Sequence, residues 1–157
     1  MSVEERAKQL FLSGANCAQA VLGAFAQELG LTEEQACRLG SGFGAGMGRM
    51  REVCGAFSAL VIISNWRCGP EKYGDKAGKD RQYRKIQQLS ELFKAGSGGS
   101  IVCRELLGLT KNGGETPISN ERTPEYYRKR PCLELVALAA RLAESEGDCP
   151  QNADFSQ

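Results

Sequence analysis

Apolar residues recur along most of this chain at the three- and four-residue spacing of amphipathic helices, and no segment alternates convincingly with period two. Capping residues, glycines and prolines mark where these segments begin and end. The pattern predicts three helices in the first part of the chain: one with Val3, Ala7, Leu10 and Phe11 on one face, a second from Asn16 to Gly30 with Val21, Phe25 and Leu29 inward, and a third from Thr32 to Leu39 opened by a Thr32–Gln35 capping box. It predicts a fourth helix over Cys54–Arg67 and a fifth over Asp75–Lys94 with Tyr83, Ile86, Leu89 and Phe93 inward. A short sixth helix capped by Ser100 and a brief turn at Thr123 follow, before a last helix opened by Pro131 with Leu133, Val136, Ala137 and Ala140 buried.

The segment Cys54–Arg67 is apolar on nearly every face, which predicts a buried central helix. We therefore expect an all-α fold, a single-domain bundle of about six or seven helices around that helix. Residues 109–122 are expected to form a loop. The domain is predicted to span residues 1–146, with residues 147–157 as a flexible polar tail.

A glycine-rich segment precedes this central helix, with five glycines at two-residue spacing from Gly40 to Gly48, followed by Arg49 and Arg51. Glycine backbone folds tightly and presents bare N–H groups to electron-rich partners. The alternative is a tightly packed connection between helices, with the two arginines solvated. Because a helix-opening cysteine follows directly, we favour the wall of a cofactor site, formed by Gly42, Gly44, Gly46, Gly48, Arg49 and Gly55.

Composition excludes several classes of chemistry. The chain has no histidine, which removes Cys–His catalysis, His-ligated metals and any imidazole base. A formal net charge of +1 gives no reason to expect nucleic acid as a partner. The start of the chain is charged from residue 4 and no apolar run is long enough for a membrane span, so we expect a cytoplasmic protein without such a span.

Seven cysteines are many for a chain of 157 residues without an export signal, and none of them forms a CxxC pair. Four are predicted to lie in the first turn of a helix, where unpaired N–H groups favour a thiolate: Cys17, Cys54, Cys103 and Cys132. Four such helix starts can converge on one point, although free cysteines often merely fill core space. The other three, Cys37, Cys68 and Cys149, are expected to be structural or incidental.

Several motifs resemble the C_GCAxxG_C_C family of redox-active proteins: GANCAQAV around Cys17, GFGAGMGR with VCGA around Cys54, CRELLG from Cys103, and PC at Cys132. The resemblance extends roughly from Glu4 to Leu142, and the family's four characteristic cysteines correspond to these same four. It implies redox activity but no particular reaction. Where the family has CGAxxG, this chain has Ala59 in place of the last glycine, which adds a methyl group at a helix contact.

Three functions remain open. The first, which we favour from the sequence, is electron transfer or redox sensing by an iron–sulfur cluster held by all four cysteines. The second is a cofactor-free thiol/disulfide oxidoreductase with an attacking and a resolving cysteine. The third is a structural Cys₄ zinc site, which usually pairs its cysteines at CxxC spacing. We expect a redox partner protein that the sequence does not name, and a homo-oligomer stays open.

Overall fold

The computed structural model describes residues 1–109, 115–147 and 149. Within them the chain is helical, and extended backbone pairs only in one isolated antiparallel bridge between Val53 and Val102. The prediction of an all-α fold is therefore confirmed. The elements are α1 Val3–Leu12, α2 Cys17–Ala24, α3 Glu33–Gly40, the 3₁₀ turn η1 Ser41–Phe43, α4 Gly44–Met47, α5 Gly55–Cys68, α6 Lys76–Ser97, α7 Cys103–Leu106, α8 Pro124–Lys129 and α9 Cys132–Glu146.

Side-chain caps fix several helix starts. Capping boxes open α1 at Ser2, α2 at Asn16 and α3 at Thr32, so the predicted Thr32–Gln35 box is confirmed. The predicted cap at Ser100 is wrong, because α7 begins at Cys103, after Val102, and has no side-chain cap. The Ser100 hydroxyl instead accepts the Val102 N–H at 2.9 Å, within the turn that precedes the helix.

The second helix is shorter than its pattern predicted. It ends at Ala24, and the chain continues in turns in which the Phe25 N–H donates to the Leu22 carbonyl. Phe25 and Leu29 still point into the core, where they are almost fully buried. The spacing of apolar residues therefore predicted correctly that these two side chains are buried, although the backbone at their positions is not helical.

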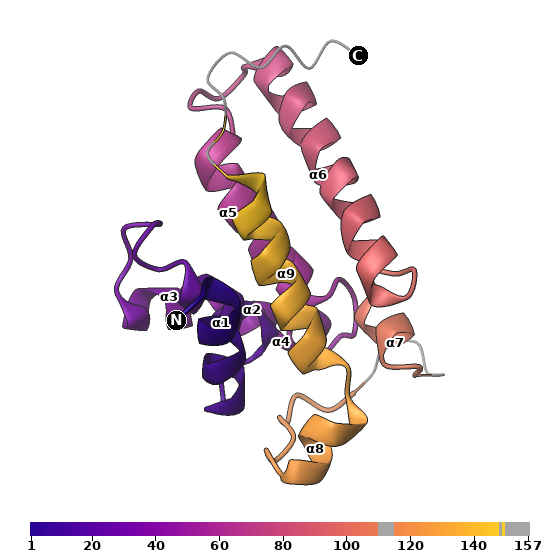
Figure 1. Ribbon diagram of the computed structural model, residues 1–157. Coiled ribbons are helices and arrows are strands. Elements are labelled where there is room, and N and C mark those ends of the chain that lie inside the picture. The colour runs from indigo at the N-terminus through magenta and orange to yellow at the C-terminus, as the bar shows by residue number, and fades with distance from the viewer. Residues whose placement is uncertain (110–114, 148, 150–157) are drawn as a thin grey trace.

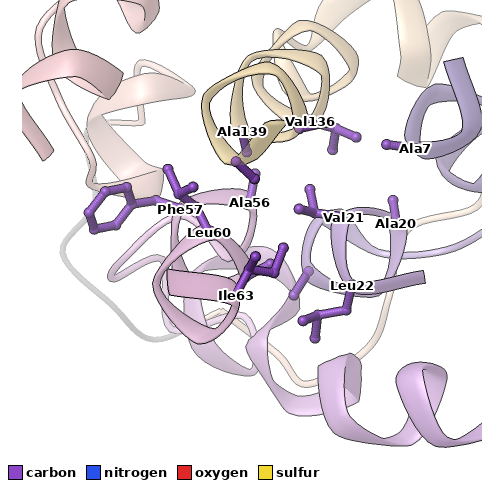
Figure 2. Packing of buried hydrophobic residues seen from close by; sticks show 14 of the residues in the cluster. Ala7, Ala20, Val21, Leu22, Ala56, Phe57, Leu60, Ile63, Val136 and Ala139 are labelled. Atoms are coloured by element: carbon purple, nitrogen blue, oxygen red, sulfur yellow. The ribbon is translucent and has the colours of Figure 1, made fainter. Parts of the chain in front are cut away.

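Helices α5, α9 and α6 run side by side, and α1 to α4 gather against one side of them (Figure 1). Helix α9 contacts α1, α2, α5 and α6, so it shares the central position that we predicted for α5 alone. Small residues let α5 and α9 approach, and Figure 2 shows Ala56 and Ala139 pointing toward each other. The exposed end of α5 carries Trp66, which is 66% exposed.

Helix α6 lies at the edge of the bundle against α5 and α9. Leu89 and Phe93 are buried as predicted, but Tyr83 is 63% exposed, so its predicted inward orientation is wrong. The buried residue one position earlier is Gln82, whose amide donates to Ser64 and Asn65 of α5. Polar side chains therefore extend the packed face of α6, which apolar periodicity could not detect.

Two regional predictions are only partly covered. Of the predicted tail, the structure describes Gly147 and Cys149, and the rest lies outside the described residues. The predicted loop over residues 109–122 likewise includes residues 110–114, which lie outside them. Among the helices that are described, none is long and apolar enough to cross a membrane.

The fold matters for the site because several helices begin at one end of the bundle. Helices α5 and α9 both start at the lower end in Figure 1, where α4, α7 and α8 also lie. The Val53–Val102 bridge joins the segment before α5 to the segment before α7 at this end.

Candidate functional site

All four predicted site cysteines lie at helix starts. Cys17 and Cys132 are the first residues of α2 and α9, Cys103 is the first residue of α7, and Cys54 is the N-cap of α5. Cys54, Cys103 and Cys132 are buried, while Cys17 is half-buried. The positional prediction from the sequence is therefore confirmed for each of them.

Backbone hydrogen bonds hold two of these starts together. The Cys54 N–H donates to the Ile101 carbonyl at 2.7 Å, and the Cys103 N–H donates to the Glu52 carbonyl at 2.6 Å. The four thiols are close enough for their charges to interact, since the other three all oppose ionisation of Cys17 and raise its pKa. The fold thus brings together cysteines that are 37, 49 and 29 residues apart in the sequence.

Cys17 and Cys132 influence each other's ionisation more strongly than any other pair of site cysteines. Hydrogen bonding from the Cys17 thiol lowers the pKa of Cys132 to about 7, and the guanidinium groups of Arg130, Arg51 and Arg122 add to this effect against the cost of burial. Cys132 in turn raises the pKa of Cys17 well above its ordinary value. One of the two thiols therefore begins to ionise near neutral pH while the other stays protonated.

The other two thiols stay protonated. Burial raises the pKa of Cys54 to about 12, although backbone N–H groups of Phe57 and Ala56 point at its sulfur. Burial also raises the pKa of Cys103, against the pull of Arg51, whose Nη1 lies 3.7 Å from Sγ. The expectation that each helix start favours a thiolate is wrong at these two positions, because desolvation outweighs the first-turn N–H groups, and it is wrong at Cys17, whose pKa is raised by Cys132 and by burial.

The glycine-rich segment is a left-handed turn. Positive φ angles occur at Gly46 (67°) and Gly48 (54°) and also at four non-glycine residues: Ala45, Met47, Arg49 and Arg51. A Cβ atom on Gly46 would lie 2.5 Å from the Cys103 Cβ and 2.7 Å from the Arg51 Cα, so only glycine fits there. Strain of this kind is concentrated at functional sites in proteins.

The predicted cofactor wall divides into two groups. Gly44, Gly48 and Arg49 line a cavity beside Cys17. Gly46 and Gly55 instead allow close packing, since a Cβ on Gly55 would lie 3.3 Å from the Cys17 Cβ. Gly42 does neither, because a Cβ there would meet nothing within 4 Å.

The cavity has a volume of about 350 Å³ and reaches only Cys17 of the described cysteines. Four arginines contribute to its wall: Arg49, Arg51, Arg122 and Arg130. The other residues of the wall are Asn16, Ser41, Gly44, Ala45, Gly48, Pro117, Ser119, Asn120 and Tyr126. The half-buried thiol therefore faces a strongly basic space.

The side chains as they stand do not fit a metal centre held by all four cysteines. Across the described residues, which include all seven cysteines, no three Cys, Asp or Glu side chains surround one point closely enough to hold a metal ion. Cys54 and Cys103 would also have to lose their protons against raised pKa values before they could act as ligands. The iron–sulfur and zinc predictions stay untested.

A comparison with known protein families tests the family resemblance that the cysteine motifs indicated. Residues 15–146 match the family model described as "Putative redox-active protein (C_GCAxxG_C_C)". The chain belongs to this family. No curated protein and no solved structure matches it.

For this C_GCAxxG_C_C protein, sequence reasoning missed the basic residues around the pair. The alternative in which Arg51 is solvated is wrong, because Arg51 is only 4% exposed and forms a 2.9 Å ion pair with Glu115. Arg122 and Arg130 were not singled out at all. A usable signal was present, since the segment RTPEYYRKRPC places four basic residues within ten positions before Cys132.

The remaining cysteines of the C_GCAxxG_C_C chain lie away from the pair. Cys37 is exposed, and its sulfur accepts a hydrogen bond from Gln19 at 3.3 Å. Cys68 ends α5, where burial and a hydrogen bond with Cys149 raise its pKa to about 12. Their expected lack of a role at the site is compatible with these positions but is not tested by them.

Proposed function

We propose that this protein is a thiol–disulfide redox protein whose Cys17 and Cys132 interconvert between a dithiol and a disulfide. The observation that carries the proposal is the mutual effect of two thiols at the starts of α2 and α9, since Cys17 lowers the pKa of Cys132 to about 7 and Cys132 raises the pKa of Cys17. A dithiol in which one thiol ionises near neutral pH reacts there, because the thiolate is the nucleophile in disulfide exchange. Membership of a redox-active family supports the same reading.

The exposure of the two sulfurs assigns their order of attack. Cys17 is half-buried and lines the cavity, whereas Cys132 is only 8% exposed. Cys17 therefore meets the acceptor first, and Cys132 serves as the base and then as the resolving thiol. A disulfide needs the two sulfurs to approach to about 2.05 Å.

The reaction needs an acceptor disulfide and transfers two electrons to it. The Cys17 sulfur attacks one acceptor sulfur, the acceptor S–S bond breaks, and the Cys17 proton passes to the Cys132 thiolate. The departing thiolate takes that proton, and the Cys132 sulfur then attacks the Cys17 sulfur. The Cys17–Cys132 bond forms as the mixed disulfide breaks, leaving the acceptor as one thiol and one thiolate.

The other two thiols protect this exchange from side reactions. Cys54 and Cys103 stay protonated under the raised pKa values that burial gives them, so they compete poorly as nucleophiles. Arg51 links Cys103 to Glu115, because its guanidinium contacts both the Cys103 sulfur and the Glu115 carboxylate.

Counting thiols before and after oxidation tests the proposal. The reduced full-length protein, treated with one equivalent of a small disulfide without oxygen, should lose two titratable thiols. The C17S and C132S variants should form only a mixed disulfide or fail to react, while C37S, which removes an exposed thiol outside the pair, should still close the bond. Loss of two thiols in the C17S variant would show that another pair carries the reaction.

A Cys₄ iron–sulfur centre is a second candidate, supported by the mutual influence of all four thiols on their ionisation. Cys17, Cys54, Cys103 and Cys132 would hold it, and the cluster would supply one-electron transfer. Iron and acid-labile sulfide in anaerobically prepared protein, lost in each of the four single serine variants, would favour this candidate over the dithiol.

A further inference from the structure

The cavity beside Cys17 has the size and wall of a small-molecule site. Its volume of about 350 Å³ lies at the lower end of the roughly 300–1,000 Å³ found for ligand pockets. The Tyr126 ring gives it an apolar side, while Asn16, Ser41 and Asn120 offer polar groups. Such a space accommodates a compact molecule next to the sulfur that attacks first.

Positive charge in this cavity is largely uncompensated. Arg49 and Arg51 share a single carboxylate, Glu115, at 3.0 and 2.9 Å. Elsewhere in the described part of the wall, no carboxylate pairs with Arg122 or Arg130. Four guanidinium groups therefore face one carboxylate and the single negative charge that forms on the Cys17–Cys132 pair.

The two unpaired arginines are held by neutral groups. Arg122 donates to the Ala15 carbonyl at 3.0 Å and stacks on the rings of Phe11 and Tyr126. Arg130 stacks on Tyr126, with its guanidinium carbon 4.7 Å from the ring centre. Carbonyl and ring contacts orient these cations without neutralising their charge. A planar guanidinium fixed in this way is suited to bind a carboxylate through two parallel hydrogen bonds.

We propose that this cavity binds a low-molecular-weight disulfide that carries carboxylate groups, and that this acidic disulfide is the oxidant of the Cys17–Cys132 pair. The inference rests on the proposed function, since it names the acceptor in the exchange already written. The carboxylates lie against Arg122 and Arg130, and the S–S bond lies at Cys17. The Cys17–Cys132 pair gives up two electrons to the acceptor S–S bond, and the acceptor leaves as one acidic thiol and one acidic thiolate.

A small acidic molecule fits better than a large acidic partner. The net charge of the whole chain is only +1, so the chain gives no bulk attraction to an acidic protein. A carboxylate of a small molecule can enter the cavity and reach Arg122 and Arg130, whereas a folded protein reaches them only where its side chains project into it.

Rates of oxidation by three disulfides of different charge test the inference. Reduced full-length protein is mixed with glutathione disulfide, which is anionic, with cystamine, which is cationic, or with neutral dithiodipyridine. The wild-type protein should react about tenfold or more faster with the anionic than with the cationic disulfide, after each rate is divided by that of a small free thiol. This preference should shrink as salt is added.

Two arginine substitutions on neighbouring residues provide the matched comparison. Arg130→Gln should reduce the preference for the anionic disulfide about tenfold, whereas Arg128→Gln, an exposed residue of α8 outside the cavity, should leave it unchanged. Both variants lose one positive charge, so a difference between them reports the cavity and not the net charge. Dithiodipyridine corrects for any change in the reactivity of the thiols themselves.

The outcomes separate this inference from the proposed function. If dithiodipyridine also fails to close the Cys17–Cys132 bond, the proposed function fails. If dithiodipyridine closes the bond but the wild type shows no charge preference, or Arg128→Gln reduces the preference as much as Arg130→Gln, the acidic-disulfide site is wrong. A reaction that only a folded acidic protein disulfide supports would contradict the small-molecule assignment.

Discussion

At the scale of single residues, burial and hydrogen bonding decide which cysteine reacts. All four site cysteines occupy helix starts, yet only Cys132 has a lowered pKa, because only it accepts a hydrogen bond from another thiol. Cys54 is close to backbone N–H groups and is still held near pKa 12 by burial. A position at a helix start therefore does not by itself predict a reactive cysteine when the sulfur is buried.

The pH dependence of alkylation follows from this difference. The reactive thiolate forms as pH rises through the pKa of about 7, so the rate should fall below that pH and level off above it. We expect a midpoint near pH 7 for iodoacetamide modification of the pair, read by mass spectrometry of the Cys17 and Cys132 peptides. A midpoint at about 8.5, the ordinary cysteine value, would contradict the lowered pKa of the pair.

Replacing Cys17 by serine should move this midpoint upward. The Cys132 thiolate loses the thiol donor that lowers its pKa, and the shorter Cβ–O bond of serine places the replacement hydroxyl farther from the Cys132 sulfur. The same alkylation series on the C17S variant measures the shift, and an unchanged midpoint would mean that the arginines alone set the pKa of Cys132.

The glycines of the left-handed turn give a second test at this scale. Gly46→Ala should destabilise the protein by about 2–4 kcal/mol, because the methyl group meets Cys103 and Arg51 and the positive φ is unfavourable for alanine. Gly42→Ala is the matched control, since its Cβ meets nothing and its stability should not fall. Urea denaturation measures both, and equal losses would show that the segment has no close approach to protect.

At the scale of elements, capped helices were predictable and the glycine-rich segment was not. The Thr32–Gln35 box and the Asn16 cap are local signals within four residues, so the starts of α2 and α3 could be predicted from the sequence. The left-handed turn depends instead on packing against Cys103, which lies more than fifty residues away. The spacing of the glycines indicated an unusual backbone conformation, but it could not show that the turn is left-handed.

Ala59 tests the one departure from the family motif. Its side chain is fully buried within α5, so the added methyl is accommodated in the core. Ala59→Gly should therefore destabilise the protein by about 1–2 kcal/mol, through lower helix propensity and the lost methyl contact. A stabilised variant in thermal or urea unfolding would show that the methyl group strains the helix contact.

At the scale of the whole molecule, the site exists only because distant helix starts meet at one end of the bundle. The sequence indicated which cysteines lie at helix starts, although the cap assigned to the helix of Cys103 was wrong, and it could not tell a quartet from a pair. Whether four cysteines or two act together depends on which sulfurs lie close to one another in the fold and which are buried. The basic cavity was missed for the same reason, since Arg51, Arg122 and Arg130 come together only in the fold.

Disulfide mapping of the oxidised protein tests the central claim most directly. Anaerobically prepared protein is assayed for metal and sulfide, oxidised with one equivalent of a small disulfide, blocked with an alkylating reagent, digested and analysed by mass spectrometry. The account predicts one linked peptide pair joining Cys17 to Cys132, with Cys54 and Cys103 recovered as alkylated thiols after unfolding. Iron and sulfide bound in proportion to protein and dependent on all four cysteines, with no Cys17–Cys132 peptide, would contradict it.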